Sequence, residues 1–151
     1  MTNNYGEPIR SANDFAGKHA QHVVLIHFPI ALFMTGVGLD LLSRGKRDSR
    51  FAGAAYWNLS IAAAAVIPTV LTGWLAWHFV LEDQKIKGLL LLHLLAASTA
   101  TLLVIASWWV HWRIRNTPMP LPRYRIPLEL LGVAAIGLTA HLGGFLSGVN
   151  S

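Results

Sequence analysis

The 151-residue chain contains no cysteine. Disulfides, thiolate metal sites, iron–sulfur clusters and the covalent attachment of a c-type haem all require cysteine, so the sequence excludes each of them. Any cofactor of this protein must therefore be held without a covalent bond to sulfur.

Charged residues are also scarce, at 13% of the chain against roughly 25% in a typical soluble domain, whereas 54% of the residues are hydrophobic. A soluble helical bundle would need one polar stripe on each helix, and residues 88–112 have none. Almost uncharged blocks, each long enough to cross roughly 30 Å of hydrocarbon as a helix, occupy residues 21–39, 52–81, 88–112 and 126–148. The sequence predicts an all-α integral membrane protein.

The short connections make consecutive helices antiparallel neighbours, so we expect an up-down four-helix bundle. Residues 1–20 are predicted to be a separate outer tail because Asn, Asp, Gly and Pro interrupt every apolar run there. This polar stretch lacks the apolar centre of a signal peptide, and the first span is expected to direct insertion. The predicted membrane domain covers residues 21–149, with spans at about 22–42, 53–80, 88–112 and 127–148.

Basic residues concentrate in the two connections that lie on one side of the predicted bundle. These are Arg44, Lys46, Arg47 and Arg50 after the first span, and Arg113, Arg115, Arg123 and Arg125 after the third. The positive-inside rule then puts both connections in the cytoplasm and both termini in the periplasm, across a bacterial inner membrane. This arrangement explains the net charge of +5 without nucleic-acid binding. Asp40 precedes Arg44 by four residues and is expected to pair with it.

Seven histidines are present, and an ionisable side chain within a span is a functional-site hypothesis by default. From the helical rise per residue, His27, His93 and His141 lie at one shared depth, roughly 7 to 10 Å inside the outer boundary. These three residues come from three different spans. His78 is predicted to be shallower, and His19 and His22 to lie at the outer surface. His111 is predicted to be at headgroup level on the inner side, beside a cluster of tryptophans.

Small residues flank the deep histidines at helical spacing. His141 shares a stripe with Ala134, Gly137, Gly144 and Gly148, and similar small faces run through His93 and His27. A haem held between helices needs an imidazole from each of two helices with small residues beside it. The same stripes would also serve close helix packing.

The same histidines also allow other chemistries. A copper or zinc centre formed by His27, His93 and His141 is an alternative, as is a second outer site framed by His22 and His78. The only carboxylates near the three deep histidines are Glu82 and Asp83, in the middle connection. Ser/His/Asp catalysis is not indicated, because no carboxylate lies at the depth of the deep histidines.

The segment HVVLIHFPIALF at residues 22–33 resembles the bacterial membrane protein family called domain of unknown function 2231. Supporting pieces are LDLL at residues 39–42, TGW at 72–74, His93 and LGG at 142–144, and the likeness covers about residues 21–149. Val23 departs from the family, which tends to have proline after its first histidine. The resemblance implies a four-helix membrane protein, often encoded near or fused to electron-transfer components, and suggests binding of b-type haem.

The leading hypothesis is a b-type cytochrome-like electron-transfer subunit rather than a complete enzyme. One bis-histidine haem b near the periplasmic face would pass electrons between a periplasmic redox protein and quinone or another membrane subunit. His27 and His93 are the first choice of axial ligands, His141 is the third candidate and His78 the fourth, with Gly137 and Gly144 beside the cofactor. The alternative is a non-catalytic scaffold or assembly subunit of a larger complex or homo-oligomer. A transporter is less favoured, because no charge pair lies within the predicted spans.

Overall fold

The computed structural model describes residues 12–46, 49–79, 86–117 and 120–146. These residues form four helices and no strand: α1 (Ala12–Lys46), α2 (Ser49–Phe79), α3 (Gly88–Ile114) and α4 (Arg125–Leu146). Each of the four helices is long and apolar enough to cross a membrane. The predicted class, an all-α membrane helical bundle, is confirmed.

Helices α1 and α4 begin before the spans predicted for them. Helix α1 begins at Ala12, inside the segment expected to be a tail, because no proline interrupts the chain between Pro8 and Pro29. Helix α4 begins at Arg125, so Pro127 falls in its first turn, where the backbone amides have no partner within the helix. Helices α1 and α2 both continue through an internal proline, Pro29 and Pro68 respectively.

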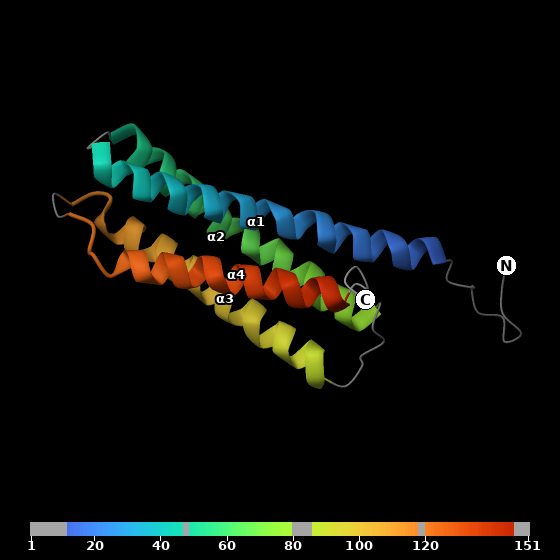
Figure 1. Ribbon diagram of the computed structural model, residues 1–151. Coiled ribbons are helices and arrows are strands. Elements are labelled where there is room, and N and C mark those ends of the chain that lie inside the picture. Colours follow the sequence, from blue (N-terminus) through green and yellow to red (C-terminus); the bar gives the residue numbers. More distant parts are fainter. Residues whose placement is uncertain (1–11, 47–48, 80–85, 118–119, 147–151) are drawn as a thin grey trace, which may run out of the picture.

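The bundle consists of two helical hairpins that lie side by side (Figure 1). Helix α1 packs mainly along α2, and α3 packs mainly along α4, with fewer contacts between the hairpins. Glycines allow the closest approaches. A Cβ atom at Gly36 would come within 3.0 Å of the Leu59 side chain, and one at Gly132 would come within 2.7 Å of Phe33 Cζ. Gly132 therefore lets α4 pack directly against α1.

The two ends of the bundle differ in how tightly they pack. We call the end where α1 leads into α2 and α3 into α4 the basic end, and the opposite end the histidine end. Helix α2 buries no described side chain after Val66, and helix α4 buries none after Ile136. The apolar core thus lies in the middle of the bundle and toward the basic end, and its buried members are Phe33, Val37, Leu59, Ala62, Ala63, Val66, Ala100, Val104 and Ile136.

Many large apolar side chains face outward, including Ile67, Leu102 and Leu131, which are 60 to 67% exposed. A water-soluble protein would bury such side chains, whereas a membrane protein presents them to lipid. The outward surface thus agrees with four membrane-crossing helices.

Candidate functional site

His93 is the deep histidine that faces into the bundle. Its ring on α3 lies against Gly143 of α4, where an added Cβ atom would stand 3.2 Å from His93 Cε1. The ring hydrogen-bonds the backbone of Thr139. Its Nδ1 atom is buried and has no hydrogen-bond partner in the described part of the chain. Metal-ligating histidines characteristically give one ring nitrogen to a backbone carbonyl or carboxylate and the other to the metal. His93 has one nitrogen available in this way.

An apolar groove lies between α3 and α4 beside His93. Its volume is about 350 Å³, and it is lined by Leu92, Leu95, Ala96, Thr99, Ala135, Leu138 and Leu142. Leu92 and Leu142, which line the groove, are the chain neighbours of His93 and Gly143, but the His93 ring is not part of the lining. The wall is almost wholly hydrocarbon and suits an apolar ligand surface.

His27 and His141 are exposed on the surface of the single chain. Cβ atoms added at Gly38 and Gly137, on the small-residue stripes that run through these two histidines, would contact nothing within 4 Å. The two stripes therefore face away from the rest of the chain. Among the three histidines predicted to share one depth, His93 alone points into the described bundle.

The remaining histidines of this end contact neighbouring aromatic or polar side chains. His141 meets the Phe145 ring edge to face at a centroid distance of 4.9 Å. His78 stacks on Trp74, with 5.8 Å between ring centroids and an interplanar angle of 4°. The side chain of His19 lies outside the described residues. None of these contacts engages His93.

His22, predicted to lie at the outer surface, also joins α1 to α2. Its Nδ1 atom lies 3.1 Å from Thr72 Oγ1 in a hydrogen bond. Because the Thr72 hydroxyl donates to the carbonyl of Pro68 or Thr69, it accepts from His22. A Cβ atom at Gly73 would come 3.1 Å from the His22 ring, so the ring packs closely on α2. His22 thus lies half-buried just before the first candidate membrane span, with a partner on the neighbouring helix.

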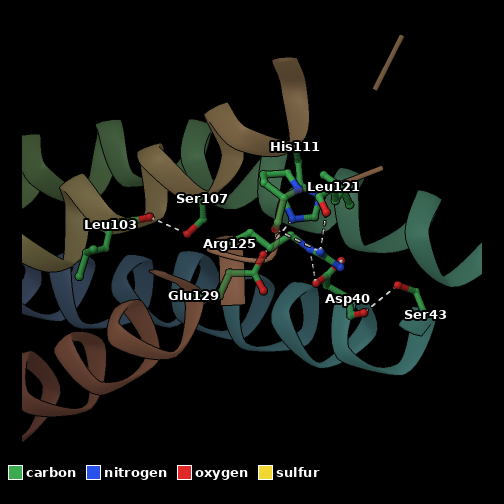
Figure 2. A network of polar contacts seen from close by, with 9 residues as sticks. Asp40, Ser43, Leu103, Ser107, His111, Leu121, Arg125 and Glu129 are labelled. Atoms are coloured by element: carbon green, nitrogen blue, oxygen red, sulfur yellow. Dashed lines mark hydrogen bonds and ion pairs between the residues drawn. The ribbon is translucent and has the colours of Figure 1, made fainter. Parts of the chain in front are cut away.

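At the basic end, three helices contribute polar side chains to one buried charge cluster, which Figure 2 shows from close by. Its members are Asp40 of α1, Ser107 and His111 of α3, and Arg125 and Glu129 of α4, none of them more than 6% exposed. Arg125 binds Asp40 through two bonds, from Nε to Oδ2 at 2.9 Å and from Nη2 to Oδ1 at 3.2 Å. Its remaining nitrogen, Nη1, donates to the carbonyls of Leu121 and Pro122 at 3.4 Å each.

The second ionisable pair of the buried charge cluster joins α3 to α4. His111 Nε2 lies 2.8 Å from Glu129 Oε1. The other carboxylate oxygen, Oε2, is buried and has no partner in the described part of the chain. Ser107 is fully buried nearby, and its hydroxyl donates to the carbonyl of Leu103 on the same helix. Glu129 Oε2 is therefore the one fully buried side-chain oxygen or nitrogen of the cluster without a partner among the described residues.

These contacts correct two sequence-based expectations. Arg125 is not a loop residue but the buried first residue of α4, where it pairs with Asp40. The bundle also contains buried pairs of ionisable side chains, although no charge pair was expected within the spans. His111, predicted to lie beside the tryptophans on the inner side, is 4% exposed and bonded to Glu129. The side chain of Arg44, the partner predicted for Asp40, lies outside the described residues.

A periodicity in the sequence could have indicated the cluster. Asp40 continues the buried face of Phe33 and Val37, and Arg125 and Glu129 continue the face of Gly132 and Ile136 at alternating spacings of four and three. Charged residues in register with a buried face are expected to be buried themselves.

One group of acidic and histidine side chains in the described part of the chain offers ligand atoms that all lie within 4.8 Å of one another: Asp40, His111 and Glu129. This spacing is compatible with one bound cation. The guanidinium of Arg125 already places a positive charge on Asp40 at the same spot. His27, His93 and His141 do not form such a group.

Comparison with known proteins gives one match. The family described as predicted membrane protein (DUF2231) matches residues 18–149. No curated protein and no solved structure matches the chain.

Proposed function

The chain belongs to the DUF2231 family of predicted membrane proteins, and on this premise we propose that it is a membrane-embedded, b-type cytochrome-like electron-transfer subunit. The family description assigns no activity, so the proposal depends on the residues. The observation that carries it is the environment of His93. Its ring hydrogen-bonds the backbone of Thr139, and its buried Nδ1 atom has no partner in the described part of the chain. That is the arrangement of a histidine that ligates a metal.

The rest of the histidine end also suits haem b. The groove between α3 and α4 offers apolar surface beside His93 for a porphyrin face. His27 is the first choice for the second axial ligand, and His141 and His78 follow; the side chains of all three are exposed on the bundle surface. Haem held by two imidazoles supplies one-electron chemistry and has no open position for oxygen.

The first experiment is the visible spectrum of the purified, reduced protein, expressed with adequate haem supply. We expect the sharp, split bands of six-coordinate low-spin haem b, and we expect His93→Ala to abolish them. Of His27→Ala, His141→Ala and His78→Ala, the one that removes the second ligand should convert the spectrum to a five-coordinate form. His22→Ala is the matched control, because its ring lies at the same end but is bonded to Thr72. A colourless wild-type protein overturns the proposal.

We further propose that the protein lies in the bacterial inner membrane with both termini in the periplasm. Arg125 is withdrawn into the core, so seven of the eight basic residues assigned to the basic end remain for the positive-inside rule, against four on the other side. The histidine end then faces the periplasm, where a redox protein or quinone can exchange electrons with it.

Reporter fusions test this orientation. A reporter active only in the cytoplasm should be silent when fused to Ser151 and active when inserted after Arg47. The reverse pattern would place the histidine end on the cytoplasmic side and remove the periplasmic redox partner from the proposal.

The second candidate function is a non-catalytic scaffold or assembly subunit. It is favoured by the two stripes through Gly38 and Gly137, which face away from the chain and leave room for a partner helix to approach closely. If a partner or a second copy packs on the α4 stripe, Gly137→Leu should reduce the size of the complex extracted in mild detergent and leave the single chain folded. A complex of unchanged size would contradict a scaffold role for this face of α4.

A further inference from the structure

The buried charge cluster at the basic end carries one negative charge in excess when His111 is neutral. Asp40 and Glu129 are both carboxylates, and Arg125 supplies one positive charge. No other ionisable side chain is buried in the described part of the chain. Helix α2 has no buried ionisable side chain among the described residues: Arg50 is exposed, and the Tyr56 hydroxyl accepts a hydrogen bond from Arg115. An uncompensated charge withdrawn from water into a membrane protein is strongly unfavourable.

The hydrogen bonds place this excess charge on Glu129. Arg125 uses Nε and Nη2 on Asp40, and its Nη1 faces the carbonyls of Leu121 and Pro122. The guanidinium therefore neutralises Asp40. Glu129 receives one contact, from His111 to Oε1, while Oε2 has no partner among the described residues. The carboxylate of Glu129 is thus the group that still requires a positive charge.

We infer that the buried charge cluster is a binding site for one proton, which His111 holds as an imidazolium ion against Glu129. The 2.8 Å separation of His111 Nε2 and Glu129 Oε1 is typical of a charge-assisted hydrogen bond. His111 also lies in the last turn of α3, where the helix dipole favours a cation. With the proton bound, the two carboxylates balance the two cations.

A divalent metal ion fits the same atoms less well. It would bring two positive charges to a cluster that lacks one, and it would lie beside the guanidinium of Arg125 on Asp40. The proton strengthens the contact between His111 and Glu129, which joins α3 to α4. The contact between Arg125 and Asp40 joins α4 to α1 in the same way. The site is independent of the haem proposal and lies at the other end of the bundle.

The charge state of His111 tests the inference directly. We would record nitrogen NMR spectra of the purified protein labelled with ¹⁵N-histidine at about pH 7.5, where an unperturbed histidine is mostly neutral. The His111 signal is identified as the one that is missing from the spectrum of His111→Gln. In the wild type, both ring nitrogens of His111 should carry protons. Ser107→Ala is the matched control, since Ser107 is buried in the cluster but uncharged, and it should leave the signal unchanged.

Three charge variants sharpen the test. Asp40→Asn removes the carboxylate that Arg125 neutralises, so Arg125 then balances the charge of Glu129 and His111 should lose its second ring proton. Replacing Asp40 with Leu and Arg125 with Met together removes one charge of each sign, so the excess remains and His111 should keep both protons. Glu129→Gln removes the carboxylate that His111 contacts, so His111 should be neutral in this variant as well. This variant supplies the measurement if Asp40→Asn does not fold.

Three results would overturn the inference. The first is a neutral His111 in the wild type. The second is a His111 that stays charged in both Asp40→Asn and Glu129→Gln. The third is one equivalent of tightly bound metal in elemental analysis, with a His111 signal that changes on chelation, because a metal would then supply the missing positive charge.

Discussion

The two ends of the bundle use the same four helices in opposite ways. At the basic end, Asp40, His111, Arg125 and Glu129 turn inward and bond one another. At the histidine end, His27, His78 and His141 are exposed, and the buried Nδ1 atom of His93 has no partner in the described part of the chain. The basic end therefore uses its polar side chains to hold the fold. The histidine end keeps most of its histidine side chains at the surface of the bundle.

The packing of apolar side chains follows the same division. Phe33, Leu59 and Val104 are almost fully buried in the core, whereas α2 after Val66 and α4 after Ile136 bury no described side chain. Polar groups within hydrocarbon are costly unless they find partners. An end that combines loose packing with several histidines is therefore the better candidate for a cofactor or partner site, and the basic end for the stabilising contacts.

The largest effect is expected from breaking the ion pair between the hairpins. Arg125→Ala leaves Asp40 buried without its cation, and loss of one partner of a buried pair costs about 3–5 kcal/mol. We expect a large fall in the thermal unfolding midpoint of the purified protein in detergent. The double change of Asp40 to Leu and Arg125 to Met, which leaves no unpaired charge at these positions, should be markedly more stable than Arg125→Ala. Equal losses in the two variants would contradict the proposed role of the pair.

An intermediate effect is expected from filling a close contact between helices. At Gly132, an added methyl group would stand 2.7 Å from Phe33 Cζ, and the Phe33 ring is fully buried. Gly132→Ala should therefore destabilise the protein by about 1–3 kcal/mol, the usual cost of overpacking a core. Gly137→Ala is the matched control on the same helix, because an added Cβ meets nothing within 4 Å. Equal unfolding midpoints for the two variants would show that α1 and α4 do not pack as described.

Sequence patterns were sufficient for the fold, because an apolar block long enough to cross the membrane predicts a helix whatever its neighbours are. They also placed His93 with His27 and His141 at one depth, but they did not indicate which of the three rings faces into the bundle. The buried charge cluster was missed because positive-inside reasoning counts Arg125 as a loop charge, and local reasoning gives Asp40 a partner four residues away.

The partners of the buried charged side chains depend on which helices are neighbours in the bundle. Arg125 and Asp40 are 85 residues apart in the sequence, and His111 and Glu129 are 18 residues apart. These pairings depend on α4 packing between α1 and α3, which hydrophobic periodicity within a single helix does not specify.

The smallest effect is expected at the histidine end, from the hydrogen bond between His22 and Thr72. Thr72→Val keeps the shape of the side chain but removes the acceptor for His22 Nδ1, so we expect a loss of about 0.5–1.5 kcal/mol, the net contribution of one such bond. Thr99→Val is the matched control, since its exposed hydroxyl bonds only Leu95 of its own helix. Chemical denaturation of both variants measures the difference. Because this end stabilises the fold less than the basic end, a loss from Thr72→Val as large as that from Arg125→Ala would contradict the division of roles between the two ends.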